Sequence, residues 1–416
     1  MLFLGRALRI FGSVACAFWL AGSPSAAQNP ISQAAPNSTP TFHTASRLVV
    51  VNVVVTDPNS KAITGLSKQD FELSEDGKVQ SLRAFESHVP SRQPSVVCDL
   101  HLGPDEHRSF PNFAADGAIN VVLFDLLNTP AEDQRYAKQQ LIEFLETLPH
   151  GQRVALFTLN NDLRMVGDFT TPTQDLIAAV NNLHPIVSSL LLDRNSDGWR
   201  ANNIYSAAYD WPSNGNTLEQ LEQAMPSVGN GTAWWWAHLR FQQTFEAMGE
   251  IAGALSGYGG RKNLLWLSGG FPGTVSLKRK EPLFESSDYL AIFQKYSGKL
   301  ESSQISLYPI DLRGLKNMGR PGIPESSDSV FAGMDSRQAM DEIAAQTGGR
   351  AFYNINDLKL AMQHSIEHGA TYYTLAYSPR NQRWNGAFRR LTVKINHRDV
   401  KLDYREGYYA TKDRHP

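Results

Sequence analysis

A chain of 416 residues, 42% of them hydrophobic and 10% aromatic, is long enough for two or three domains with substantial cores. The 39 basic and 41 acidic residues leave a formal net charge of -2, so the chain as a whole does not attract nucleic acid or an anionic membrane surface. These numbers predict a globular protein and argue against nucleic acid as a partner.

The first 27 residues have the pattern of an export signal. A basic start with two arginines is followed by an apolar stretch, residues 10–22, and by small residues at a cleavage site that ends at Ala27. We therefore predict an exported protein, periplasmic or secreted. No other stretch approaches the roughly 20 apolar residues of a membrane helix, so the mature chain is predicted to have none. The context of Cys16 resembles a lipoprotein site only weakly, which disfavours a lipid-anchored form.

Composition and periodicity divide the rest of the chain into β, α/β and β parts. The β-branched run LVVVNVVVT, followed by turns and a further strand, predicts a small N-terminal β module. Strands and helices then alternate, which predicts a mainly parallel sheet with helices on both faces. Because the chain ends in β again, we expect its two terminal β segments to pair into one β-sandwich, with the α/β domain inserted between them. The predicted parts are a signal peptide (1–27), a flexible tether (28–45), an N-terminal β module (46–87), a connector (88–117), an α/β domain (118–369), a C-terminal β segment (370–410) and a tail (411–416).

Within the α/β domain the predicted elements can be placed in chain order. Residues 185–236 form a predicted loop insertion between two helices, and the insertion contains five of the eight tryptophans. Such aromatic side chains can anchor a ligand or fill a local core, and we expect the insertion to open toward the carboxyl edge of the sheet. The predicted strands are 119–125, 153–159, 164–169, 263–268, 304–310 and 350–353, and the predicted helices are 130–148, 172–183, 237–256, 286–301, 335–347 and 355–368.

The most informative stretch is AINVVLFDLLNT, residues 118–129. Its apolar run ends abruptly in Asp125, as expected of a strand buried on both faces. Open α/β sheets bind ligands at their carboxyl edge, because loops diverge there and the next helix points its N-terminal amides at the same crevice. Asn128 and Thr129 are capping-type residues, and Pro130 suits the first turn of a helix. The stretch therefore predicts a strand, a polar loop and a helix, with a carboxylate at the binding edge.

Several segments together resemble a known group of proteins. They are GLSKQDFELSEDGKVQ, VVLFDLLNT, GRKNLLWLSGGFP, YPIDLRGL, TGGRAFYNINDL, and the ending YYTLAYSP with REGYYA. Over residues 47–410 the chain resembles exported bacterial proteins, of the acidobacterial type, that carry a von Willebrand factor type A-related domain. The resemblance implies a Rossmann-like α/β fold and an adhesion-type role, although members of this group are mostly known as domains without assigned activities.

The type A fold also implies a metal-ion-dependent adhesion site at the carboxyl edge of the sheet. Such a site holds a hard divalent cation, usually Mg²⁺ with Mn²⁺ or Ca²⁺ as alternatives, and leaves one position for a ligand. Its first motif, Asp-x-Ser-x-Ser, corresponds here to Asp125, Leu127 and Thr129. The middle hydroxyl is therefore missing, and the amide oxygen of Asn128 is the candidate to compensate for it.

The other expected ligands match less well. The threonine of the next loop corresponds to Thr244, with Thr232 as the alternative, while Ser268 stands where the distal aspartate is expected. Asp311 can replace the lost carboxylate because it ends the next strand at the same edge. The predicted degenerate metal site therefore comprises Asp125, Asn128, Thr129, Thr244, Ser268 and Asp311. The alternative is structural: Asp125 caps the following helix or accepts loop amides, and Asp311 orders the adjacent turn.

The sequence offers no convincing catalytic set. Ser268 lies on a strand-end turn, LSGG, but the GxSxG pattern is absent. His364 and His368 lack the HExxH pattern and are expected on a solvated helix face. We therefore predict a non-enzymatic binding or adhesion protein that recognises a protein or cell-envelope ligand at the carboxyl edge of the sheet. Two alternatives stay open: a hydrolase that uses Ser268 in the same crevice, and a metal-free scaffold in an envelope assembly.

Overall fold

The computed structural model describes residues 47–90, 118–149, 152, 154–169, 171–185, 230–270, 286–312 and 336–411. All of them belong to one compact unit, Ser46–Pro416. The predicted export signal and tether, and most of the predicted connector and tryptophan-bearing insertion, lie outside the described residues. Within the described part of the chain, no helix combines the length and the apolar character needed to cross a bilayer.

The centre of the α/β part is a five-stranded sheet with the strand order β7-β6-β5-β8-β9. Strands β6, β5, β8 and β9 run parallel, and β7 pairs antiparallel with β6. Every residue of β6, β8 and β9 is buried, which explains why these strands are mostly apolar and do not alternate regularly with polar residues. The strands are β5 (Ile119–Asp125), β6 (Val154–Leu159), β7 (Leu163–Gly167), β8 (Lys262–Ser268) and β9 (Ile305–Asp311).

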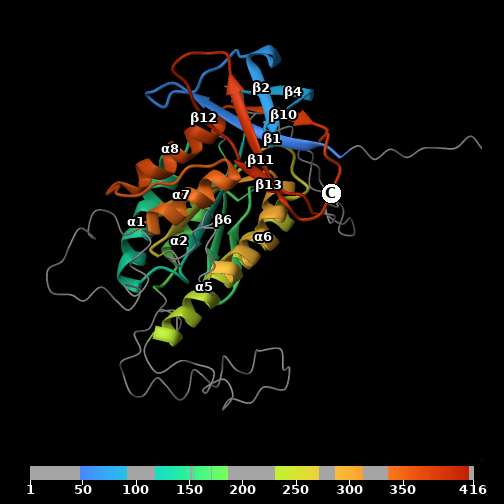
Figure 1. The fold of residues 1–416 in the computed structure, drawn as a ribbon. Coiled ribbons are helices and arrows are strands. Elements are labelled where there is room, and N and C mark those ends of the chain that lie inside the picture. Colours follow the sequence, from blue (N-terminus) through green and yellow to red (C-terminus); the bar gives the residue numbers. More distant parts are fainter. Residues whose placement is uncertain are drawn as a thin grey trace, which may run out of the picture. The chain divides into compact units, whose positions relative to one another are not determined.

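Helices cover both faces of this sheet. On one face, Val121 and Trp266 pack with Phe245 of α5 and with side chains of α6 and α7. On the other face, Val122 packs with Phe144 of α1 and with side chains of α2 and α8. Figure 1 shows α5 and α6 lying side by side along the first face. The helices are α1 (Ala131–Glu146), α2 (Thr173–Asn181), α5 (Asn230–Leu255), α6 (Ser286–Ser302), α7 (Ser336–Thr347) and α8 (Leu358–Ala370).

The two terminal β segments form one sandwich of two four-stranded sheets, β12-β1-β10-β4 and β13-β11-β2-β3. Strand β10, from the C-terminal segment, lies between β1 and β4 of the N-terminal segment, and β11 pairs with β2. Both sheets contribute side chains to a single core. The strands are β1 (Val49–Thr56), β2 (Phe71–Glu75), β3 (Lys78–Gln80), β4 (Leu82–His88), β10 (Tyr372–Tyr377), β11 (Phe388–Ile395), β12 (Lys401–Asp403) and β13 (Gly407–Tyr409), with a short 3-10 helix, η1 (Lys68–Asp70), before β2. The predicted fold class, an α/β domain with a mainly parallel sheet and flanking β segments that pair into one sandwich, is confirmed.

Three local predictions are corrected. Helix α5 begins at Asn230, seven residues earlier than expected, so residues 230–236 are helical and not part of a loop insertion. The predicted strand 350–353 is reduced to an isolated bridge between Phe352 and Ile310. His368 is buried on α8, only 6% exposed, and does not lie on a solvated helix face.

Candidate functional site

Three polar strand ends lie side by side at the carboxyl edge of the central sheet. Asp125 on β5 is paired in register with Ser268 on β8, which is paired with Asp311 on β9. Neighbouring strands are about 4.8 Å apart, so the backbones of Asp125 and Asp311 are separated by about 10 Å. The structure therefore places both predicted carboxylates on one edge, with Ser268 between them.

The carboxylate of Asp125 is fully buried and surrounded by hydrogen-bond donors. Its Oδ1 accepts from the backbone N–H of Asn128 at 3.0 Å. Its Oδ2 accepts from the side-chain amide of Asn128 at 2.8 Å, the indole Nε1–H of Trp266 at 2.9 Å and the hydroxyl of Ser268 at 3.1 Å. An ionised carboxylate offers about four lone-pair sites, and the two groups of Asn128 and the indole of Trp266 fill three of them even when the Ser268 hydroxyl donates elsewhere.

The side chain of Asn128 connects this carboxylate to helix α5. Its Nδ2 donates to Asp125 Oδ2 and also to Thr244 Oγ1 at 2.9 Å. The Thr244 hydroxyl donates in turn to the carbonyl of Arg240 at 2.7 Å. Thr244 is therefore a threonine that the fold brings into the cluster.

Thr129 is the last predicted metal ligand in this loop, and its hydroxyl bonds with two backbone groups. Its hydroxyl donates to the carbonyl of Asp125 and accepts the N–H of Gly269 at 2.9 Å. The carbonyl of Thr129 accepts from Gln134 of α1 at 2.7 Å. Because these bonds join β5, α1 and the segment after β8, the loop is held from three directions.

Burial and hydrogen bonding act in opposite directions on Asp125. Burial raises the pKa of its carboxyl group, and the hydrogen bonds from Asn128, Trp266 and Ser268 lower it, with burial the larger effect. Leaving a carboxylate in such a site without donors would cost several kcal/mol. The surrounding donors are therefore what allows this acid to lie inside the protein.

As arranged, these residues do not fit a divalent cation. Three donors already point at Asp125 Oδ2, and Leu127, at the position of the expected middle hydroxyl, is fully buried in the core. Among the described residues, no group of three or more histidine, cysteine, aspartate or glutamate side chains is arranged to hold a metal ion. Of the two possibilities the sequence left open for Asp125, the hydrogen bonds favour the structural one.

Trp266 is the member of the cluster that the sequence did not suggest. It lies two residues before Ser268 on β8, so both side chains point to the same face of the sheet. A buried indole N–H usually requires an acceptor. The pattern Trp-x-Ser at the end of a strand can indicate a partner for a buried acid, but only when the neighbouring strand is known to end in that acid.

Ser268 lacks the surroundings of a nucleophile. It is only 4% exposed, and its single hydroxyl proton has two acceptors within reach, Asp125 Oδ2 and the carbonyl of Gly270 at 2.7 Å. None of its described hydrogen-bond partners is a histidine. This geometry gives the hydrolase alternative no support.

A second buried polar cluster joins the α/β part to the sandwich. His368 on α8 lies with Nδ1 3.0 Å from the hydroxyl of Tyr308 and Nε2 2.8 Å from Asp403 of β12. Arg350 also contacts Asp403, at 2.6 Å, and Arg261 donates to Tyr308 at 2.9 Å. Burial lowers the pKa of His368 more than the nearby Asp403 raises it. The sequence missed this cluster because its members are scattered along the chain.

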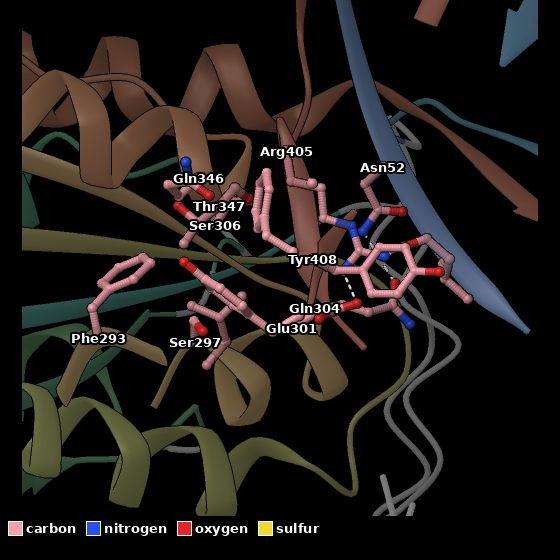
Figure 2. Close-up of a pocket in the computed structure, with 15 residues that line it drawn as sticks. Asn52, Phe293, Ser297, Glu301, Gln304, Ser306, Gln346, Thr347, Arg405 and Tyr408 are labelled. Carbon is pink, nitrogen blue, oxygen red and sulfur yellow. Dashed lines mark hydrogen bonds and ion pairs between the residues drawn. The ribbon is translucent and has the colours of Figure 1, made fainter. Parts of the chain in front are cut away.

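The cavity in Figure 2 lies along the same junction, where β1 meets α6 and the segment between β12 and β13. Arg405 forms an ion pair with Glu301 and donates to the carbonyl of Val50 at 2.6 Å, while Asn52 donates to Gln304 at 3.1 Å. The cavity volume is about 40 Å³, and one water molecule needs about 10–15 Å³. This space therefore has room for a few water molecules and is part of the junction between the two parts of the fold.

Comparison with known proteins finds solved structures with a similar fold at low sequence identity. No family model and no curated protein matches the chain. Similar solved structures include proximal thread matrix protein 1 from the mussel byssus, with 11% identity, a TM-score of 0.30, and coverage of 60% of this chain and 47% of that one. An aerotolerance-related membrane protein from Bacteroides fragilis shares 12% identity, with a TM-score of 0.29 and coverage of 61% and 98%. The minor pilin PilB from Streptococcus sanguinis shares 10% identity, with a TM-score of 0.30 and coverage of 61% and 62%.

The chain spans about half the length of the mussel structure that it matches. At identities of 10–12%, these similarities concern the fold alone. The function is therefore argued from the chain's own residues.

Proposed function

We propose that this chain is an exported, non-enzymatic binding or adhesion-type protein that recognises a protein or cell-envelope ligand at the carboxyl edge of its central sheet. The observation that carries the proposal is the row of strand ends, Asp125, Ser268 and Asp311, in register at that edge. These side chains are themselves buried, so a ligand would contact the loops that leave the edge. Open α/β sheets bind ligands there because the loops leave from that edge.

The chain leaves this edge after β8 and again after β9, directly following the polar strand ends Ser268 and Asp311. The predicted export signal supplies the location outside the cytoplasm.

The proposal is tested by affinity capture with the mature chain, residues 28–416, immobilised and exposed to envelope extracts. A specific ligand should be recovered by the wild type and by Glu72→Gln, which changes an exposed carboxylate of the sandwich. Recovery should fall at least tenfold with Asp162→Asn, which changes an exposed carboxylate just after the carboxyl end of β6. Equal recovery by both variants would contradict the proposal.

The enzymatic alternative has its own test. Ester and peptide substrates should be hydrolysed no faster with the wild type than without protein. Hydrolysis that disappears in Ser268→Ala would replace the proposed function with a hydrolase.

A further inference from the structure

We propose that the side-chain amide of Asn128 takes the place of a cation in the cluster around Asp125, so that the site is complete without metal. The type A fold leads one to expect a carboxylate from the first strand and a threonine hydroxyl from the next loop on a shared cation. Here one amide nitrogen lies 2.8 Å from Asp125 Oδ2 and 2.9 Å from Thr244 Oγ1. It joins the same two groups, from β5 and α5, that a cation would join.

The chemistry of the partners fixes which end of the amide faces the carboxylate. An ionised carboxylate only accepts hydrogen bonds, so the amide must present its NH₂ group to Asp125. The same group has a second hydrogen, which Thr244 Oγ1 accepts because the hydroxyl proton of Thr244 is directed to the carbonyl of Arg240. Both hydrogens of the amide are therefore used, and each is used on a predicted metal ligand.

Two further donors complete the shell around the carboxylate. The backbone N–H of Asn128 donates to Oδ1 of Asp125, and the indole N–H of Trp266 donates to Oδ2. A cation bridging Asp125 and Thr244 would have to displace the amide of Asn128 in a place where Asp125 is fully buried and Asn128 only 2% exposed, so water could not readily replace the lost bonds.

The loop has also lost the hydroxyl that would complete a metal site. Leu127 is fully buried and packs in the same core as Val121 and Leu123. Its backbone N–H donates to the carbonyl of Leu159 at 2.9 Å, which ties the loop to β6. This position is used for packing, so the loop offers no second hydroxyl to a cation and the link from β5 to α5 is made by the amide of Asn128.

The test measures Mn²⁺ binding by the mature chain, residues 28–416, using titration calorimetry and the electron paramagnetic resonance signal of free Mn²⁺. The wild type should show no saturable binding. Asn128→Ala, which removes the bridging amide, should bind Mn²⁺ saturably, and adding Asp125→Asn should abolish that binding. Asn120→Ala is the matched control, because Asn120 is also buried on β5 and its amide oxygen accepts from Asn263 at 3.0 Å, far along the strand from Asp125.

Several results would overturn the inference. One is saturable Mn²⁺ binding by the wild type that is lost in Asp125→Asn. Another is a folded Asn128→Ala protein that binds no Mn²⁺, since the amide would then not be what excludes the cation. Saturable Mn²⁺ binding by the control variant Asn120→Ala would also overturn the inference.

If Asn128→Ala does not fold, the wild type alone decides the question. A cation that binds only the folded state raises the melting temperature. The melting temperature should therefore be equal in excess Mn²⁺ and in excess chelator, and a rise with Mn²⁺ that is absent in Asp125→Asn would reject the inference. These outcomes do not depend on whether an envelope ligand is found, so they are independent of the proposed function.

Discussion

At the scale of single residues, the chain contains two buried acids that are satisfied in different ways. Asp125 is fully enclosed, and its partners Asn128, Trp266 and Ser268 are all neutral. Asp403 is partly exposed and is held by Arg350 and His368. Burial alone would raise the pKa of Asp403, but the hydrogen bond from His368 and the charge of Arg350 lower it overall. Asp125 therefore has a structural role, whereas Asp403 contacts a histidine whose protonation depends on pH.

His368 should make the stability of the protein depend on pH. In the unfolded chain a histidine takes up a proton near pH 6.5, whereas burial lowers the pKa of His368 in the folded protein. The stability that neutral His368 contributes is thus present above about pH 6.5 and is lost as the pH falls from there through the folded pKa. Asp403 does not contribute in this range, because its pKa is lowered from an ordinary value that is already far more acidic. His368→Gln should flatten the pH dependence of the unfolding free energy by up to about 1.4 kcal/mol per pH unit.

Urea unfolding at several pH values between about 7.5 and 5 measures this effect. His364→Gln is the matched control, since His364 lies on the same helix but is exposed. If both variants show the same pH dependence as the wild type, the buried cluster does not titrate as argued.

At the scale of elements, strand β10 is the one on which the sandwich depends. It lies between β1 and β4, with Leu375 paired to Val51 on one side and to Phe85 on the other. Leu375 is fully buried in the sandwich core, whereas Leu48, next to the start of β1, is 51% exposed. The sandwich therefore has one leucine that is fully buried and another that is largely exposed.

Replacing these two leucines separates burial from side-chain chemistry. Leu375→Ala should lower the unfolding free energy by about 2–5 kcal/mol, because it removes buried methyl groups and leaves a cavity. Leu48→Ala should change it by no more than about 0.5 kcal/mol. Guanidinium unfolding of both variants gives the comparison, and equal losses would show that β10 is not central to the core.

The elements also show what the sequence could predict. Strand β5 was predicted with its observed bounds, because a continuous apolar run that ends in a charged residue marks both the strand and its end. The early start of α5 was missed, although residues 233–239 contain no proline or glycine to end a helix and Asn230 is a capping-type residue. The strand predicted at 350–353 does not form, because Pro309 on β9 has no N–H to donate to it. Only two backbone bonds remain there: Asp311 N–H donates to the carbonyl of Phe352, and Phe352 N–H donates to the carbonyl of Pro309.

The candidate site was predictable only in part. Asp125, Thr129 and Ser268 were found because motifs and strand ends are local in the sequence. The partnership of Trp266 with Asp125 required the pairing of β5 with β8, and the bridge from Asn128 to Thr244 required the packing of α5. Local patterns specify which residues end strands, whereas the order of strands in the sheet decides which of them meet.

At the scale of the whole molecule, the sandwich is a joint product of the two ends of the chain. Asn52 and Thr374 are hydrogen bonded although they are 322 residues apart. The α/β part is attached to the sandwich through Glu301 with Arg405 and through His368 with Asp403. The N-terminal β segment therefore has no complete sheet of its own.

Truncation tests this dependence. A chain that ends at Ala370 lacks β10 to β13, so β1 and β4 lose their shared neighbour and β2 loses β11. It should bind a hydrophobic dye and lose its cooperative melting transition. A chain that ends at Thr411 keeps every described strand and should melt within a few degrees of the full chain. A truncated chain at Ala370 that melts cooperatively would show that the N-terminal segment folds without its partner.

The position of β10 has a consequence for how the protein is made. Synthesis proceeds from the amino end, so the valine-rich first strand emerges long before the strand that must lie beside it. Until then it is an apolar segment of high β propensity with an open edge, the kind of segment that associates with other chains. A newly made molecule therefore carries this open edge until the residues of β10 have been synthesised, so its folding depends on contacts between distant parts of the chain.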